Sequence, residues 1–476
     1  MSHEVELKLE IEAGASDRVI GQPWFDEAQC KSRFQCSVYF DTPDWELKRR
    51  GYTLRVRSID GRFIQTVKAL GDGAGLFERG EWEYEIGGPK PDLERLRSTP
   101  LADIDVNRLE EIIRSDVSRT ACRLSHEGAE IELDVDQGIM FAGGHELPVS
   151  EVEIELLRGD ADSVMAFARR IADQVPVKLG VLSKSERGFA LADGTLSKVS
   201  KAGPVSLREG MNVAEAFATI VFACIRHFRV NEPLVIEHRG MEALHQSRVA
   251  MRRLRSAMSL FRPAIADGEC RRIAGELSWF TGELGEARNL DVYLQRMLLD
   301  KERETLQVRR EAAYDRVIAA MESDRFRLFM IDLAAWSVLG KWRDGNKAGR
   351  ELEPFVRRRL DRLWHGIGQA RRLRMMNEKQ RHKLRIRSKK LRYGLEFVKA
   401  LHADRREPRD AFAKQIETLQ EELGLANDIV AARSLMSTDA WPFPQQHGSD
   451  AEVGAHLRVA QRSLKKMRRI GRYWAV

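Results

Sequence analysis

Charged residues recur at every second position in several short stretches of the first 200 residues. Because residues two apart in a β-strand share a face, each stretch predicts a strand with one charged and one partly apolar face. A sheet that turned its charged side inward could hold a hard cation and an anion together, whereas an ordinary sheet would leave these charges solvated. The alternating residues are Glu4, Glu6 and Lys8; Arg55 and Arg57; Glu81, Glu83 and Glu85; and Glu151, Glu153 and Glu155.

The net charge of +7 is divided unevenly along the chain. Residues 1–200 contain 26 Lys and Arg against 37 Asp and Glu, a net of −11, and residues 201–476 carry the remaining +18. A chain of 476 residues is also longer than one compact domain usually is. We therefore expect two domains, residues 1–197 and 207–476, joined by a linker at 198–206 that contains a Gly-Pro break.

The first domain is predicted to be rich in β-strands, because short alternating segments are separated by Gly-containing turns. Helices are expected within it at 107–114 and 161–175. From 207 onward the periodicity becomes helical, so the second domain is predicted to be all-α and the whole chain α+β. The strand candidates are 4–12, 35–41, 52–59, 62–69, 79–86, 119–126, 129–136, 138–142 and 149–157.

An internal repeat marks the helical half. The segment that begins at His245 aligns without a gap with the segment that begins at His382, in the pattern H-x2-R-[VI]-x2-[RK]-[RK]-L-R. Two copies of one helical unit predict two bundles related by pseudo-twofold symmetry. Since helical spacing puts these positions on one face, each copy presents a stripe of one histidine and three cations: His245, Arg248, Arg252 and Arg255, and His382, Arg385, Lys389 and Arg392.

The two basic stripes predict a polyanionic partner, because like charges on one helix face repel unless a counter-charge is supplied. Carboxylates from neighbouring helices are the alternative source of that counter-charge. Specific nucleic acid binding is not expected, since no helix-turn-helix, zinc finger or aromatic RNA-binding sheet is visible and aromatic residues are scarce near the stripes. A polyphosphate chain, which has no bases, needs only such cations.

The cysteines and the hydropathy indicate where the chain resides. The five cysteines are scattered and form no CxxC pair, so we expect reduced thiols and no zinc site. The first residues lack the apolar core of a secretory signal, and no run of 18 apolar residues predicts a transmembrane helix. The expected location is the cytoplasm, where such a protein could associate with polyphosphate granules, and no membrane partner is expected.

The ordered motifs of the first half resemble those of the CYTH domain, in the triphosphate tunnel metalloenzyme superfamily. ExExK stands at Glu4 to Lys8, and YFDTPDWELKRRGYTLRVR, TVK, ERGEWEYEI, SEVEIEL and LSKSERG follow in order. Residues 207–476 resemble the CHAD domain, a helical domain named for its conserved histidines. Together they are similar to bacterial CYTH–CHAD proteins of the inorganic triphosphatase type.

The resemblance implies an eight-stranded antiparallel β-barrel forming a tunnel, in which triphosphate is hydrolysed to pyrophosphate and phosphate with Mg²⁺ or Mn²⁺. Lys8, Arg55, Arg57 and Lys68 are the expected catalytic cations, and the metal or a base such as Lys68 would activate water. Expected to bind inorganic triphosphate are Lys8, Arg55, Arg57, Lys68, Arg119 and Lys184, with Arg123 as the alternative to Arg119. Expected to bind metal are Glu4, Glu6, Glu151 and Glu153, with Asp134 as a weaker candidate. For Glu81, Glu83 and Glu155, metal binding and structural ion pairs stay open.

Other functions remain open on the same fold. Thiamine triphosphatase, nucleoside triphosphatase and adenylate cyclase share the triphosphate group, so the tunnel cations do not separate these substrates. A non-enzymatic polyphosphate-binding scaffold is the third possibility. The intact ExExK and SEVEIEL segments argue against that scaffold and favour an enzyme.

Overall fold

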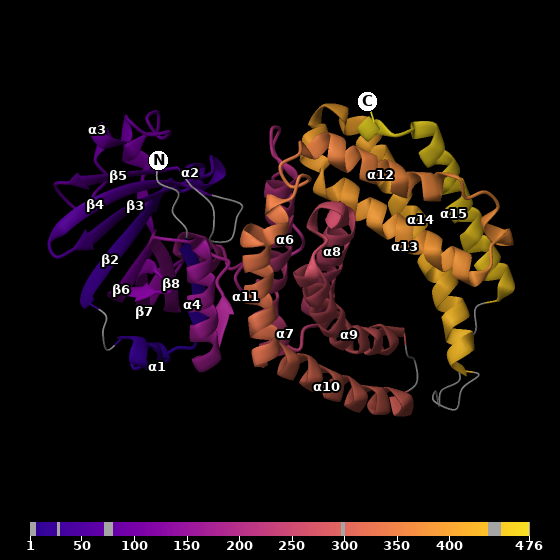
Figure 1. Cartoon of the computed structure of the whole chain (residues 1–476), viewed down its shortest axis with the longest axis horizontal. Helices are drawn as coiled ribbons and strands as arrows, with labels where there is room; N and C mark the ends of the chain where they lie inside the picture. Colours follow the sequence, from indigo (N-terminus) through magenta and orange to yellow (C-terminus); the bar gives the residue numbers. More distant parts are fainter. Residues whose placement is uncertain (1–5, 26–28, 71–79, 297–299, 437–448, 476) are drawn as a thin grey trace.

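The computed structural model describes residues 6–25, 29–70, 80–296, 300–436 and 449–475. These fall into a sheet-rich half and a helical half, which lie side by side in Figure 1. Among the described helices, none combines the length and the apolar character needed to cross a lipid bilayer.

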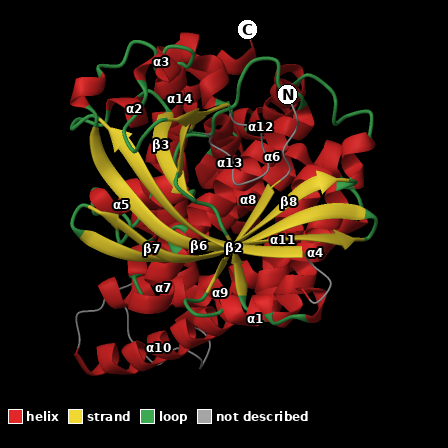
Figure 2. Ribbon diagram, turned by 90° about the vertical axis from the view of Figure 1, so that its left-hand side faces the viewer, coloured by secondary structure: helices red, strands yellow, loops and turns green. Residues whose placement is uncertain are grey.

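The first half is built on one antiparallel sheet with the order β5-β4-β3-β2-β6-β7-β8-β1-β9. Figure 2 shows that this sheet is strongly curved. The strands are β1 (Glu6–Ile11), β2 (Gln29–Asp41), β3 (Tyr52–Ile59), β4 (Arg62–Ala69), β5 (Glu81–Ile86), β6 (Glu110–His126), β7 (Ala129–Ala142), β8 (His145–Arg158) and β9 (Val177–Leu179).

The prediction of a closed eight-stranded barrel is wrong in two respects. The sheet has nine strands, and within the described residues its end strands β5 and β9 pair with β4 and β1 and not with each other. The three-residue strand β9 is too short to give an alternating signal, and it packs against helix α11 (Asp324–Leu339) of the other half. The second half therefore covers one end of the sheet.

Several strands begin or end at other residues than predicted, among them β2, β6 and β8, and two segments differ in kind or continuity. The helix expected at 107–114 is a short 3-10 turn, Val106–Arg108, followed by β6, because that segment pairs with β2 and β7 along most of its length. The strands expected at 129–136 and 138–142 are one strand, β7. Gly138 does not break it, and a Cβ there would collide with the main chain of Asp116 and Val117 on β6.

The alternation in β1 decides which face is buried. Leu7, Leu9 and Ile11 lie in the hydrophobic core, whereas Glu6 and Lys8 point to the other face. Helix α4 (Ala161–Gln174), which was predicted at 161–175, packs against the core side of β1 and β8. The charged residues thus share the face that α4 leaves free.

The helical half begins after the expected linker. Its helices are α6 (Val213–Arg229), α7 (Glu232–His238), α8 (Met241–Ile265), α9 (Gly268–Arg296), α10 (Asp300–Glu322), α11, α12 (Leu352–Gly368), α13 (Glu378–Phe397), α14 (Arg406–Met436) and α15 (Asp450–Ile470). The two repeat copies lie on α8 and α13, which contact each other, and each is followed by a long helix that packs against it, α9 and α14. The pseudo-twofold relation of two bundles stays a prediction.

The two halves share one hydrophobic core, because α4 packs directly on α11 (Figure 1). Polar contacts add to this junction: Arg169 on α4 donates to Asp332 at 2.5 Å, and Arg327 donates to the Ala172 carbonyl at 2.5 Å. The expected linker is also anchored, since Asn231 bonds both the amide and the carbonyl of Ser200.

The expectation that all cysteines are free thiols is wrong for two of them. Cys30 on β2 and Cys122 on β6 form a disulfide, with Cα atoms 4.1 Å apart. They are directly opposite in the β2–β6 register, a pairing over 92 positions that their spacing in the sequence could not show. Cys36, Cys224 and Cys270 are free.

Candidate active site

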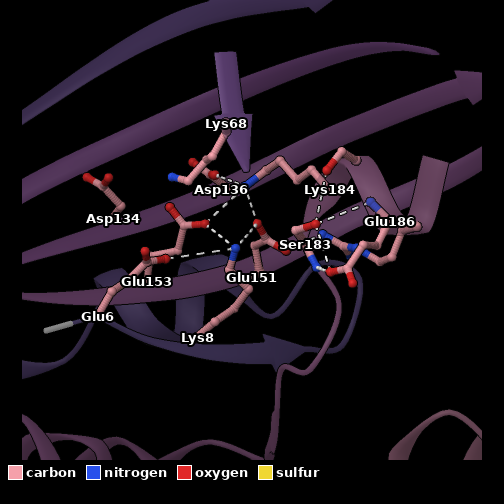
Figure 3. A network of polar contacts seen from close by, with 12 residues as sticks. Glu6, Lys8, Lys68, Asp134, Asp136, Glu151, Glu153, Ser183, Lys184 and Glu186 are labelled. Atoms are coloured by element: carbon pink, nitrogen blue, oxygen red, sulfur yellow. Dashed lines mark hydrogen bonds and ion pairs between the residues drawn. The ribbon is translucent and has the colours of Figure 1, made fainter. Parts of the chain in front are cut away.

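A network of opposite charges lies on the inner face of the curved sheet (Figure 3). Lys8 on β1 stands directly opposite Glu153 on β8, and its Nζ lies 2.6 Å from the Glu153 carboxylate. The same ammonium lies 3.7 Å from Glu151 and 3.9 Å from Glu6. Burial alone would lower the pKa of Lys8, but Glu153 and Glu151 outweigh it and raise the pKa, so Lys8 stays a cation.

Lys184 enters the same network from the first turn of helix α5 (Lys184–Ala192). Ser183 caps this helix in a box with Glu186, which fixes where the helix begins. The Lys184 ammonium lies 2.7 Å from Asp136 and 3.3 Å from Glu153, and it also contacts Glu151.

Arg119 supplies a third cation from β6. Its guanidinium bonds Asp136 and Glu153 at 2.6 and 2.7 Å and also contacts Asp134. Arg123, the alternative to Arg119, has a side chain that is 70% exposed and pairs with Glu132 at the exterior. The structure therefore places Arg119, and not Arg123, in the network.

Arg55 and Arg57 on β3 differ from these cations because their nearest partners are neutral. Arg55 donates to the Thr66 hydroxyl at 3.1 Å, and Arg57 donates to the Ser37 hydroxyl at 3.2 Å. The Arg55 Nε is buried without a hydrogen-bond partner in the described part of the chain. Burial and the charge of Arg55 lower the pKa of Arg57 to about 10. Two neighbouring guanidiniums with little counter-charge are suited to bind an anion.

Tyr39 and Lys68 extend this cationic part. Tyr39 on β2 is directly opposite Arg55, and although burial would raise its pKa, Arg55 and Arg57 lower it. Lys68 on β4 pairs with Glu81 at 2.9 Å. The charge of Lys184 also lowers the pKa of Tyr39, so the two parts face each other, although β6 and β7 lie between β2 and β8 in the sheet. Curvature of the sheet thus brings the two parts together.

The carboxylates form the other part of the site. Asp136, Glu151 and Glu153 each offer an oxygen within 4.8 Å of the others. Burial would raise the pKa values of Glu151 and Glu153, but Lys184 and Lys8 lower both, so the pair is ionised at neutral pH. Asp134 lies nearby, and burial, opposed by Arg119, raises its pKa to about 6.

This set of donors fits a hard divalent cation. Carboxylate oxygens are the ligands that Mg²⁺ and Mn²⁺ prefer. One oxygen of Asp134 is buried with no hydrogen-bond partner among the described residues, so it is available as a ligand. Glu6 lies at the edge of the network beside Lys8. Glu4, also expected to bind metal, lies outside the described residues.

Two charged members of the site, in addition to Tyr39, were missed by the sequence analysis. Asp136 is two residues after Asp134 on β7, so the same alternation rule could have placed both on the inner face. Arg187 is three residues after Lys184 on α5 and also contacts Glu151. It stands in the quoted LSKSERG segment, and its spacing of three residues from Lys184 could have placed both on one face of a helix.

The two basic stripes of the helical half merge into one basic cluster, because α8 and α13 are in contact and Arg252 donates to the Tyr393 hydroxyl at 3.1 Å. Burial and the charges of Arg385 and Arg252 lower the pKa of Lys389 to about 8. Burial and Arg288 lower the pKa of His245.

The counter-charge predicted as an alternative is largely missing from this cluster. In the described residues, the one carboxylate ion pair of the stripe side chains joins Arg392 to Glu417 at 3.8 Å. Arg248 donates to the Leu284 carbonyl and Arg255 to the Thr281 hydroxyl, both at 3.4 Å. The Nε of Arg385 is buried without a partner in the described part of the chain.

Comparison with known proteins divides the chain in the same way. The CYTH domain model matches residues 2–189, and the CHAD domain model matches residues 219–437. An inorganic triphosphatase from Haemophilus influenzae is 29% identical over 198 residues, which are 40% of this chain and 55% of that protein. The chain thus spans about half the length of this curated relative.

Solved structures also resemble each half. The CHAD domain of the plant Ricinus communis is 28% identical, covers 57% of this chain and 91% of its own, and has a TM-score of 0.45. A Hippeastrum protein described as an adenylyl cyclase with dominant triphosphatase activity is 18% identical, covers 40% of this chain and 95% of its own, and has a TM-score of 0.30.

The buried charge network predicts a pH-dependent stability. In metal-free buffer, Glu151→Gln should lower the free energy of unfolding at pH 7 by about 3 kcal/mol, because Lys184 and Arg187 lose a buried counter-charge. The wild-type carboxylates have folded-state pKa values below their ordinary value of 4.5, so their contribution is complete above that pH and is lost as the pH falls further. Between pH 7 and pH 3, the free energy of unfolding measured by urea denaturation should fall less for the variant than for the wild type.

Glu12→Gln is the matched control, since Glu12 pairs with Arg18 and both side chains are mostly exposed. It should leave the denaturation curves unchanged. Equal effects of the two substitutions would show that the buried network does not stabilise the fold.

Proposed function

Because the chain contains a CYTH domain followed by a CHAD domain, we propose that it hydrolyses inorganic triphosphate to pyrophosphate and phosphate in a metal-dependent reaction. The observation that carries this proposal is the two-part site, in which the arginine pair Arg55 and Arg57 faces a cluster of buried carboxylates across one curved sheet. An anion bound by the arginines and a cation bound by the carboxylates would neutralise each other in that space.

Different cations of the site would bind different groups. Arg55 and Arg57 would bind phosphate oxygens through their guanidinium forks, and Lys68 would add a point charge. Lys8, Lys184 and Arg119 would hold the carboxylates in place and contact the end of the phosphate chain that lies nearest to them. Phosphoryl transfer depends mainly on such positioning and charge neutralisation.

Asp134, Asp136, Glu151 and Glu153 would hold Mg²⁺ or Mn²⁺ together with Glu6 and Glu4. When bound, the metal supplies Lewis-acid stabilisation of phosphate charge and a water of lowered pKa. Lys8 does not act as a base, because its raised pKa keeps it protonated. Lys68, the expected alternative base, has a 38% exposed side chain and is better placed to bind substrate.

The helical half is proposed to bind polyphosphate. The basic cluster on α8 and α13 carries cations whose nearest described partners are mostly neutral. A polymer of phosphate groups would supply the missing counter-charge and release condensed counterions. The stripe residues of the two repeat copies are the proposed contacts.

The proposed activity is tested by phosphate release from a substrate panel. Triphosphate, ATP, thiamine triphosphate and long polyphosphate are compared with Mg²⁺, with Mn²⁺ and with EDTA. Triphosphate should be hydrolysed fastest, and hydrolysis should stop in EDTA because the carboxylates no longer hold a cation. Faster hydrolysis of ATP or thiamine triphosphate would show that the preferred substrate is not inorganic triphosphate. Full activity in EDTA would contradict the metal-dependent mechanism.

Arg57 offers a test of the anion-binding part. Arg57→Ala should lower kcat/KM for triphosphate about 10- to 100-fold, since one or two charge-assisted hydrogen bonds are lost. Arg57→Lys, which keeps the charge without the fork, should fall between wild type and the alanine variant. Arg123→Ala is the control, because Arg123 lies outside the network. If Arg57→Ala behaves like Arg123→Ala, the arginines do not bind substrate.

A fourfold variant tests the helical half. Replacing Arg252, Arg255, Lys389 and Arg392 by alanine should weaken binding of long polyphosphate at least tenfold at physiological salt, measured by fluorescence anisotropy. Triphosphate hydrolysis should stay within about twofold of wild type. The control removes four exposed arginines elsewhere on the helical half, Arg303, Arg309, Arg357 and Arg358.

The control variant keeps the same net charge as the test variant, so only the location of the charge differs. Equal loss of affinity in both would show general attraction to a basic protein. Tighter binding of nucleic acid of equal phosphate content would also overturn the polyphosphate assignment.

A further inference from the structure

The helical half reaches the charge network of the sheet through the last turn of α6. Arg226 donates from Nη1 to the Val181 carbonyl at 2.8 Å, and its Nη2 lies 2.9 Å from Oε1 of Glu186. The first partner lies three residues before α5, and the second lies in the first turn of α5. An arginine of one half is therefore bonded to the segment of the other half that carries Lys184.

The carboxylate of Glu186 serves two partners at once. Its second oxygen, Oε2, accepts hydrogen bonds from the amide of Ser183 at 2.8 Å and from its hydroxyl at 2.9 Å. The bond from the Ser183 amide, together with the bond from the Glu186 amide to the Ser183 hydroxyl at 3.2 Å, forms the capping box that starts α5. Lys184 lies between Ser183 and Glu186 in the chain, at the start of α5, so Arg226 reaches its segment through the Glu186 side chain.

A second arginine holds the strand on the other side of the network. Arg229 donates to the Leu179 carbonyl on β9 at 3.0 Å and to Glu10 on β1 at 3.0 Å. Leu179 and the following Gly180 contact β1, and the Gly180 amide bonds the Lys8 carbonyl at 2.8 Å. Both lysines of the carboxylate network thus stand on segments that α6 holds.

We propose that Arg226 is a positioning residue of the triphosphate site. It holds Glu186, and through Glu186 the first turn of α5, so that the Lys184 ammonium is directed at Asp136, Glu151 and Glu153. This inference rests on the proposed function of the site and adds a route by which the helical half sets its affinity for substrate. Arg226 touches no substrate itself.

The position of Arg226 differs from that of an ordinary interface residue. Arg169 also joins the two halves, through Asp332 on α11, and its side chain is 44% exposed against 35% for Arg226. However, α4 packs on the core side of the sheet, so the Arg169 pair does not reach α5. If interface stability were the whole role of Arg226, the two arginines would be equivalent.

The test compares Arg226→Ala, Arg226→Lys and Arg169→Ala in the full chain. Arg226→Ala should raise KM for triphosphate about 3- to 10-fold and leave kcat within about twofold. The reason is that a less well oriented Lys184 weakens binding of the substrate and of the transition state equally. Arg226→Lys should recover part of the loss. Arg169→Ala should change neither constant.

Glu186→Gln separates the ion pair from the helix cap. Glutamine at this position still completes a capping box, but it carries no charge for Arg226. The variant should match Arg226→Ala, and the double variant should be no worse than either single one, since both remove the same interaction. Additive losses in the double variant would overturn the proposed route.

Hydrogen exchange gives a readout that does not depend on activity. Amides of residues 185–192 should exchange faster in Arg226→Ala than in wild type or Arg169→Ala. Unchanged exchange there, or a KM equal to that of Arg169→Ala, would overturn the positioning role. If the wild type neither hydrolyses triphosphate nor binds it in calorimetry, the proposed function fails, while the exchange data still decide whether Arg226 holds α5.

Discussion

Burial of like and unlike charges on one face of a curved sheet is the constraint on which the rest of the structure depends. Glu151 is fully buried and the Glu153 side chain is 15% exposed, a state that is costly unless cations and hydrogen-bond donors surround both carboxylates. Lys8, Lys184 and Arg119 meet this need from three different elements. The fold must therefore hold two strands that are not adjacent in the sheet, β1 and β6, and the start of helix α5 in fixed relation, and that relation creates the site.

Counter-charge is distributed unevenly between the two parts of the site. The cations beside β8 form ion pairs with carboxylates, whereas Arg55 and Arg57 bond neutral hydroxyls. A metal would compete with the lysines for the carboxylates, and a phosphate chain would compete with the hydroxyls for the arginines. The two proposed ligands would therefore bind at different parts of the site.

The helical half contacts the elements of the sheet-rich half that carry the site. Its α11 covers β9 and α4, and its α6 bonds segments that carry Lys8 and Lys184. The shared core explains why the sheet remains an open, curved sheet within the described residues: its β9 end is covered by helix. Covering an edge strand also satisfies the requirement that exposed sheet edges be protected.

The sequence by itself determined the local elements and the identity of most site residues. Alternation two residues apart predicted β3 and β4 to the residue and put Lys8, Arg55, Glu151 and Glu153 on charged faces, because strand geometry is local. Helical spacing likewise placed the two basic stripes. Only the tertiary structure decided that the sheet stays open, that 110–114 is strand, and that Cys30 meets Cys122. It also decided that Asp136 and Arg187 join the site and that Arg226 supports α5, because these contacts join residues far apart in the chain, whose meeting depends on strand register and on packing between the halves.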